Sequence, residues 1–222
     1  MPRTARIVFP SMPYHVISRG NNREPIFQEK EDFEKYLEIC RRYKDQYEFK
    51  LYHWVLMSNH LLVETKENNL LSKIMQGINL AYTIWFNRKN GKVGHLWQDR
   101  FKSGVIDRDS YLLECGRYIE RNPLRARLVR DVEEYPWSSY GVYAYGKKDG
   151  LTDRHEIYIA MGEDQSKRHK AYREYVRSGK DKEDQEIRDR MNRGVIEAEE
   201  FRIRVEREGV DARRPKQGSP RK

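Results

Sequence analysis

Tyr118 is the residue that could do the most distinctive chemistry. Tyr111, Cys115, Tyr118 and Asn122 follow one another at intervals of three or four residues, so they share one face of a predicted helix. A tyrosine hydroxyl can act as a nucleophile on a phosphate that a metal ion polarises, and Asn122 could add a carbonyl ligand to that ion. The alternative is a tyrosine of the core, as is usual for a chain with 15 tyrosines.

His60 is the second candidate, because a neutral imidazole is a good ligand for a divalent metal. It follows Ser58-Asn59, which predicts a tight turn between strands over residues 49–57 and 60–65. A two-residue turn there would pair residue 57 with residue 60. The alternative is a histidine with a purely structural role.

Two short segments combine basic and amide side chains with aromatic rings, as proteins that bind single-stranded nucleic acid do. One is the turn that holds Arg19, Asn21, Asn22 and Arg23, and the other holds Trp97, Arg100 and Lys102. The basic side chains could contact phosphates, and the indole could stack on a base. The alternatives are a solvated loop for the first segment and, for the second, a strand with aromatic side chains inward and charges outward.

Hydrophobic periodicity predicts the scaffold of these residues. Alternation predicts strands over 13–19, 49–57 and 60–65 and one or two strands over 94–106, and helical spacing predicts helices over 29–47, 70–88 and 110–121. Asn122-Pro123 is expected to end or kink the last of these helices. The order of elements predicts an α+β fold, close to the ferredoxin-like pattern, in which helices cover an antiparallel sheet.

The composition favours a nucleic-acid partner. The 222 residues carry a net charge of +9, and 12% of them are aromatic, which is enough to build a core. Two cysteines without a CxxC pair argue against a disulfide framework and a zinc site. No apolar run approaches a membrane span and no secretory signal is visible, so we expect a soluble protein of a reducing compartment with no membrane partner.

The charge is unevenly distributed along the chain. Residues 166–222 carry 18 of the 44 lysines and arginines but only three aromatic residues. We therefore expect a domain over residues 1–150 and a charged extension over 151–222, helical or partly disordered, that ends in a basic tail.

Five segments, in this order and spacing, resemble the single-tyrosine HUH transposases, and among them the REP-associated tyrosine transposases of bacteria. They are residues 14–27, 52–65, 94–106, 111–129 and 135–145. The resemblance implies an HUH sandwich fold and a cytoplasmic, nucleoid-associated bacterial protein. It implies cleavage and transfer of single-stranded DNA next to imperfect hairpins. It favours a monomer, with a dimer as the alternative.

The resemblance also implies roles for three residues. Tyr118 would attack the scissile phosphate and become linked to the 5′ end of the cut strand, leaving a free 3′ hydroxyl. A magnesium or manganese ion would be held by the histidines of a His-hydrophobic-His strand, including His60, and by Asn122. The chain departs from this pattern, because it reads His60-Leu61-Leu62 and lacks two residues, one histidine among them.

No residue is clearly predicted to replace the missing histidine. A tight turn between the strands would put His53 and Glu64 on the face of His60, but each roughly 13 Å away by strand rise. Glu114 or Glu120 on the tyrosine helix could approach, which spacing leaves open. The chain is then either a transposase that cuts DNA or a DNA-binding relative whose metal binding and cleavage are weakened or lost. An RNA-binding or RNA-cleaving protein is a third possibility that rests only on charge and aromatic residues.

Overall fold

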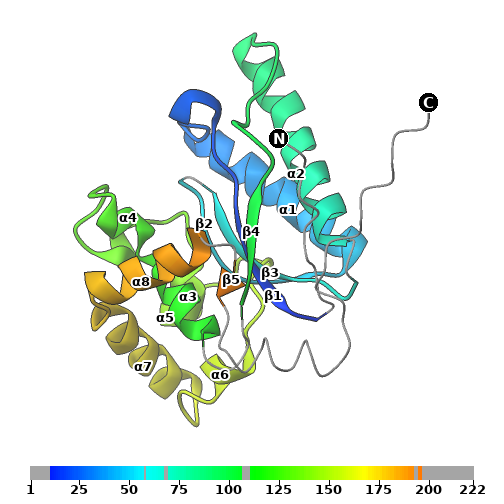
Figure 1. Cartoon of the computed structure of the whole chain (residues 1–222). Helices are drawn as coiled ribbons and strands as arrows, with labels where there is room; N and C mark the ends of the chain where they lie inside the picture. The colour runs from blue at the N-terminus through cyan, green and yellow to red at the C-terminus, as the bar shows by residue number, and fades with distance from the viewer. Residues whose placement is uncertain (1–10, 58, 68–69, 107–110, 193–194, 197–222) are drawn as a thin grey trace.

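A computed structural model describes residues 11–57, 59–67, 70–106, 111–192 and 195–196 of the chain. It contains an open sheet with the strand order β2-β3-β1-β4-β5 (Figure 1). The strands are β1 (Pro13–Ile17), β2 (Lys50–Val55), β3 (His60–Glu64), β4 (Lys102–Ile106) and β5 (Val195–Ile196). Neighbouring strands are antiparallel, except that β4 and β5 are parallel.

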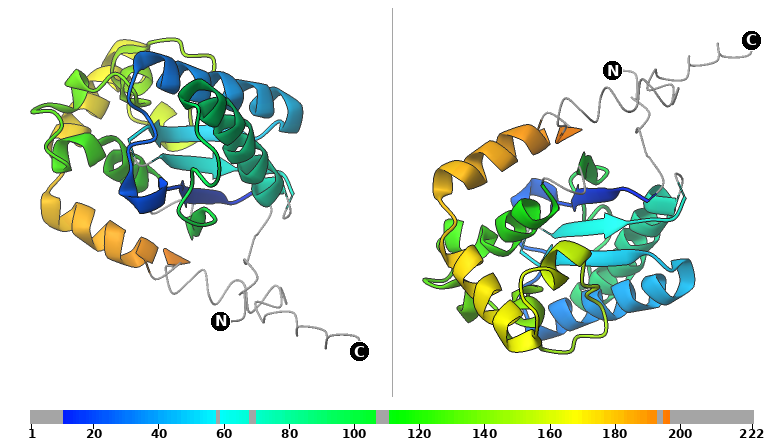
Figure 2. Two further views of the ribbon diagram at one scale, coloured as in Figure 1. Left: turned by 90° about the horizontal axis from the view of Figure 1, so that it is seen from above. Right: turned by 90° about the horizontal axis from the view of Figure 1, so that it is seen from below.

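Helices cover both faces of the sheet (Figure 2). On one face α1 (Lys30–Tyr47) and α2 (Leu70–Asn90) pack on the main apolar cluster, which includes Tyr14, Val16 and Val63 of the strands. The other face carries α3 (Leu112–Glu120). This arrangement confirms the predicted α+β fold with an antiparallel sheet covered by helices.

Further helices build on α3. They are α4 (Asn122–Arg125), α5 (Tyr140–Tyr145), α6 (Glu156–Ile159), α7 (Gln165–Arg177) and α8 (Asp181–Asn192), with short 3-10 helices η1 (Asn21–Arg23) and η2 (Val132–Glu134). Tyr143 and Tyr172 lie at the centre of a third apolar cluster formed by α5, α6 and α7, and Ile187 of α8 packs in the cluster of α3. Among the described helices, none has the length and apolar character that a membrane crossing requires.

The β2–β3 hairpin differs from the predicted one. Val55 is the partner of His60, so residue 57 does not pair with residue 60, and the loop is longer than the predicted Ser58-Asn59 turn, whose first residue lies outside the described residues. The register also shifts between Leu51 and Trp54, as at a β-bulge. An inserted bulge residue leaves no mark in the alternation of a sequence, which is why the register could not be predicted.

The bulge brings two successive side chains of β2 to α3. Tyr52 packs in the apolar cluster of Tyr118, and His53 lies against Gly116. A Cβ atom at Gly116 would stand 2.4 Å from Nε2 of His53. This glycine therefore allows α3 to approach β2 closely.

Three other predictions are refined. Within 94–106 only Lys102–Ile106 is a strand, and an isolated bridge between Gly20 and Trp97 joins the preceding residues to the segment that follows β1. Asn122-Pro123 does follow the end of α3, but it starts α4 with the proline in the first turn, where a missing amide hydrogen costs little. Residues 151–192 contain the helices α6, α7 and α8, which non-helical segments connect. The predicted basic tail lies outside the described residues, and the boundary at residue 150 stays a prediction.

Candidate active site

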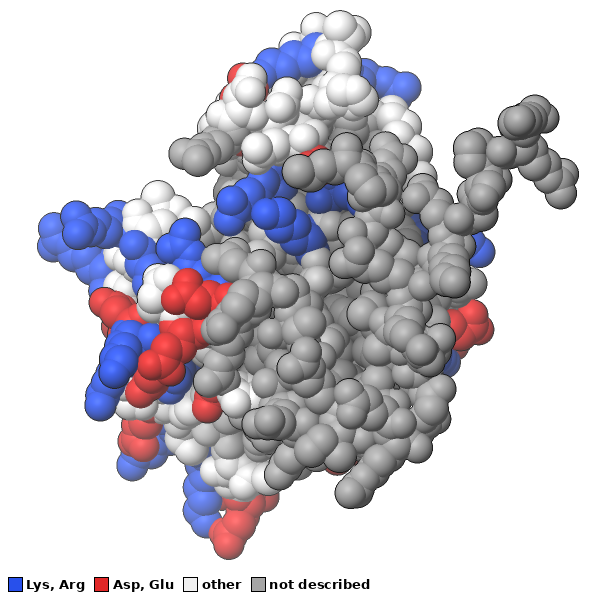
Figure 3. Space-filling model, in the orientation of Figure 1, with Lys and Arg blue, Asp and Glu red and all other residues white. Residues whose placement is uncertain are grey.

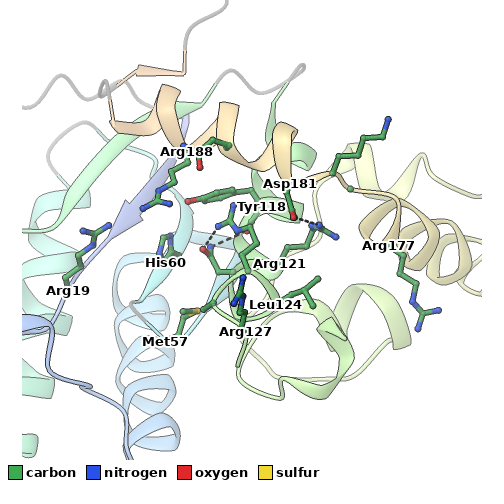
Figure 4. A pocket seen from close by; sticks show the side chains of 16 residues that line it. Arg19, Met57, His60, Tyr118, Arg121, Leu124, Arg127, Arg177, Asp181 and Arg188 are labelled. Carbon is green, nitrogen blue, oxygen red and sulfur yellow. Dashed lines mark hydrogen bonds and ion pairs between the residues drawn. The ribbon is translucent and has the colours of Figure 1, made fainter. Parts of the chain in front are cut away.

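α3 places Tyr118 between the sheet and a cavity. The side chain is 3% exposed and packs in a cluster with Val55, Leu62 and Cys115. It also lines a cavity of about 950 Å³ together with His60 and Asn122. Figure 4 shows its hydroxyl directed into this cavity, toward Arg188. The three residues predicted to do chemistry thus meet at one cavity.

Seven of the 16 residues that line the cavity are basic, and they come from α4, α7 and α8, from the loops beside these helices and from the segment after β1. They are Arg19, Arg121, Arg125, Arg127, Arg177, Lys180 and Arg188. Among the lining residues that the structure describes, Asp181 is the one carboxylate, and it lies 3.3 Å from Arg121. Figure 3 shows basic side chains gathered over α4 beside the mixed charges of α8. Such a cavity attracts phosphate groups.

His60 is a neutral imidazole in this positive environment. Burial, followed by the charges of Arg125, Arg19 and Arg188, lowers the pKa of His60 to about 3. Its ring centroid lies 6.3 Å from that of Tyr118. A neutral ring keeps a lone pair that can bind a metal ion.

His15, which the sequence analysis gives no role, lies directly against His60. Nε2 of His15 is 3.0 Å from Nδ1 of His60, and the two rings are stacked. Burial, and secondarily His60, lowers the pKa of His15 well below 6.5. The pairing of β1 with β3 creates the contact, since Ile17 is opposite His60 and His15 is opposite Leu62. The alternation of β1 fixes the face of His15, but only the strand order reveals its neighbour.

Asn122 lies one turn after Tyr118, and its side chain is engaged by its own neighbours. Its Nδ2 donates to the carbonyl oxygens of Tyr118 and Ile119, both at 3.2 Å, and its Oδ1 accepts from Arg125 at 2.5 Å. The guanidinium of Arg125 also lies 4.0 Å from the centroid of the Tyr118 ring. A metal ion at Asn122 would have to share or displace the contact with Arg125.

The acidic residues considered as replacement ligands lie elsewhere. Glu120 is bound by Ser139 and Tyr172 and lies 3.0 Å from His53, whereas Glu64 accepts a hydrogen bond from Tyr52. Glu114 is not among the residues that line the cavity. Within the described part of the chain, no group of three or more histidine, cysteine or acidic side chains is placed to hold a metal. The candidate donors next to Tyr118 are therefore the imidazole of His60, with His15 in contact with it, and the amide of Asn122.

The two segments predicted to bind DNA lie side by side. Backbone hydrogen bonds of 2.8–2.9 Å join residues 19–21 to residues 96–98. Arg19 lines the cavity of Tyr118, while a second pocket, of about 860 Å³ beside α2, is lined by Asn21, Trp97 and Arg100 among others. A single strand that reached both pockets would cross this junction.

In these segments the aromatic side chains face inward, as in the structural alternative, and the basic and amide side chains are exposed, as DNA contacts require. Trp97 is half-buried, donates from Nε1 to the carbonyl of Asn79 at 3.0 Å, and lies near the Tyr82 ring, while Phe101 is buried. The exposed side chains are those of Arg19, Asn21, Asn22, Arg100 and Lys102, and the side chain of Arg23 lies outside the described residues. Their role as DNA contacts stays a prediction.

Comparisons with known proteins identify relatives of the chain. A model of the IS200-like transposase family matches residues 8–122, a range that ends at Asn122. A solved structure of a REP-associated tyrosine transposase bound to a REP hairpin matches with a TM-score of 0.55 and 18% identity, over 69% of this chain and 92% of that chain. This similarity shows a shared fold. The search of curated proteins found no significant match.

Proposed function

Since the chain belongs to the IS200-like transposase family, we propose that it is a transposase that cleaves and joins single-stranded DNA. The meeting of Tyr118, His60 and Asn122 at one arginine-lined cavity carries this proposal. The related REP-associated transposase is bound to a REP hairpin, which supports hairpin-flanked DNA as the ligand here. All residues proposed for the chemistry come from one chain, so we propose that a monomer suffices.

In the proposed reaction the Tyr118 hydroxyl loses its proton and attacks the scissile phosphate. The bond from phosphorus to the 3′ oxygen breaks, that oxygen takes up a proton, and the 5′ phosphate of the downstream strand becomes linked to Tyr118. One phosphodiester replaces another, so attack by a 3′ hydroxyl can later reverse the step and join strands. Arg125 and Arg188 lie where they could hold the charge of the phosphate.

The donors at the cavity fit a divalent ion such as Mg²⁺ or Mn²⁺ in part. The ion would bind the neutral imidazole of His60. It would also bind the side-chain carbonyl of Asn122 after the hydrogen bond from Arg125 to that oxygen is broken. When bound, it would polarise a phosphate oxygen. The chain itself contributes a ligand kept neutral by burial and a nucleophile beside it.

A second candidate function is DNA binding without cleavage. It is favoured by the sequence His60-Leu61-Leu62, which has one histidine fewer than the family pattern, and by the engagement of Asn122 with Arg125. Both candidates use the same cavity and the same DNA. Only a covalent product separates them.

The test is incubation of the full chain with labelled, hairpin-flanked single-stranded DNA and Mn²⁺, followed by denaturing electrophoresis. We expect a covalent adduct with the wild type and none with Tyr118→Phe, although both bind the DNA. Tyr111→Phe, at the N-cap of α3 and about two turns before Tyr118, is the matched control and should retain the adduct. Binding without any adduct would establish the second candidate, and equal competition by an RNA hairpin would contradict DNA as the ligand.

A further inference from the structure

We propose that His15 supplies a second imidazole to the metal site, in place of the histidine that is missing after His60. The inference rests on the proposed metal-dependent function. The family pattern has two histidines two residues apart on one strand, whereas this chain has His60 alone, and Leu62 stands two residues further along β3. His15 is the cross-strand partner of Leu62, so it projects from the same position of the sheet on the neighbouring strand.

The two imidazoles have the separation that one ion requires. Nε2 of His15 and Nδ1 of His60 are 3.0 Å apart. Two nitrogens at adjacent corners of an octahedron, with bonds of about 2.1 Å to the ion, lie about 3 Å apart. No backbone movement is needed to bring the donors together.

The pair also faces the nucleophile. The ring centroids of His15 and His60 lie 6.2 Å and 6.3 Å from that of Tyr118. An ion held by both imidazoles would therefore lie near the Tyr118 ring, which carries the attacking hydroxyl. His15 reaches this place from β1, whereas the histidine of the family pattern would reach it from β3.

The arginines around the cavity have a consequence for this site. Arg19, Arg125 and Arg188 repel a divalent cation, and a DNA phosphate among them supplies the opposite charge. We therefore expect the ion to bind more tightly in the presence of DNA than in its absence.

The contact between His15 and His60 could instead be a structural hydrogen bond through which His15 only orients His60. The number of imidazoles bound to the ion decides between a metal ligand and an orienting residue. The parent for this test is the full chain carrying Tyr118→Phe, which cannot form a covalent adduct with DNA. One sample of it receives Mn²⁺ alone, and a second receives Mn²⁺ together with hairpin-flanked DNA. Electron spin echo envelope modulation then counts the imidazole nitrogens on the ion. We expect two in the parent and one in His15→Gln, with Mn²⁺ affinity weakened at least about tenfold.

His169→Gln, on α7, is the control and should keep two imidazoles and the parent affinity. One imidazole in the parent, no bound Mn²⁺, or an unchanged count in His15→Gln would each overturn the inference. The parent count decides even if His15→Gln fails to fold. If the parent shows two imidazoles but the wild type, with Tyr118 intact, forms no adduct with DNA, the proposed cleavage is overturned and the metal site is retained.

Discussion

Two pairs of buried histidines lie beside α3, with the same closest contact and different surroundings. Ring nitrogens of His15 and His60 are 3.0 Å apart, and so are those of His53 and His155. His60 lines the arginine-rich cavity next to Tyr118. The second pair is tied to a buried carboxylate instead. The contact between two imidazoles thus does not decide their role, and what lies next to the contact does.

The second pair belongs to a hydrogen-bonded network that holds helices to the sheet. Glu120 is fully buried and accepts from Ser139 at 2.6 Å and from Tyr172 at 2.7 Å, with His53 Nδ1 at 3.0 Å. His53 also stacks on Tyr143 at 4.3 Å between centroids. The network joins β2, α3, α5 and α7, so we expect this pair to act in stability and the first pair to act on ligands.

The largest expected effect is on the network. Glu120→Ala should lower the free energy of unfolding by about 3–5 kcal/mol, because Ser139, Tyr172 and His53 lose a buried acceptor. Urea unfolding measures it. Glu114→Ala, half-buried on the same helix, is the control and should change stability by less than about 1 kcal/mol. Equal effects of the two variants would remove the contrast between the two histidine pairs.

The cavity of the first pair should respond to phosphate. Arg19→Ala should weaken binding of hairpin-flanked single-stranded DNA about tenfold and lower the slope of log affinity against log salt by about 0.7. Fluorescence anisotropy at several salt concentrations measures both. Arg88→Ala, at the exposed end of α2, should leave the slope unchanged. The same loss in both variants would mean that general charge, and not the cavity, binds the DNA.

The smallest expected effect is the pH dependence of the second pair. Burial, followed by His53, lowers the pKa of His155 to about 2. The unfolded chain takes up this proton near pH 6.5 and the folded chain does not. Stability from His155 is therefore complete above pH 6.5 and is lost as the pH falls below it, by at most about 1.4 kcal/mol per pH unit.

Between pH 7.5 and 5.5, the unfolding free energy of the wild type should fall by about 1 kcal/mol more than that of His155→Gln. Urea unfolding at the two pH values measures the difference. His95→Gln, whose side chain is exposed, should behave as the wild type. If the unfolding free energy of His155→Gln falls as much as that of the wild type, the pair of His53 and His155 accepts a proton in the folded chain. The proposed difference between the two histidine pairs would then be wrong.

The fold and the tyrosine helix could be predicted because they depend on local periodicity and on spacing along the chain. The helix predicted over 110–121 is observed as Leu112–Glu120, with Tyr118 and Asn122 at the same cavity. His15 could not be predicted as a neighbour of His60, since that contact depends on which strand lies beside β3. Tyr52 and His53 follow each other in β2 and both face α3. This depends on a β-bulge, which the alternation of the sequence does not reveal.

Part of the charge near the C-terminus serves packing, which composition alone could not show. Arg117 and Arg121 of the α3 region are buried and pair with Glu183 at 2.6 Å and Asp184 at 2.9 Å on α8. These pairs hold α8, which carries Arg188, over the cavity. Some charged side chains of the C-terminal part therefore stabilise the packing of α8, and others, such as Arg188, line the cavity.

The most direct test of the central claim is to identify the residue that becomes linked to DNA. The adduct formed with Mn²⁺ is digested with nuclease and protease and mapped by mass spectrometry. We predict a nucleotide on Tyr118 in the wild type, and loss of the adduct in His60→Gln while DNA binding persists. A nucleotide on any other of the 15 tyrosines, or no adduct in the wild type, would contradict the account.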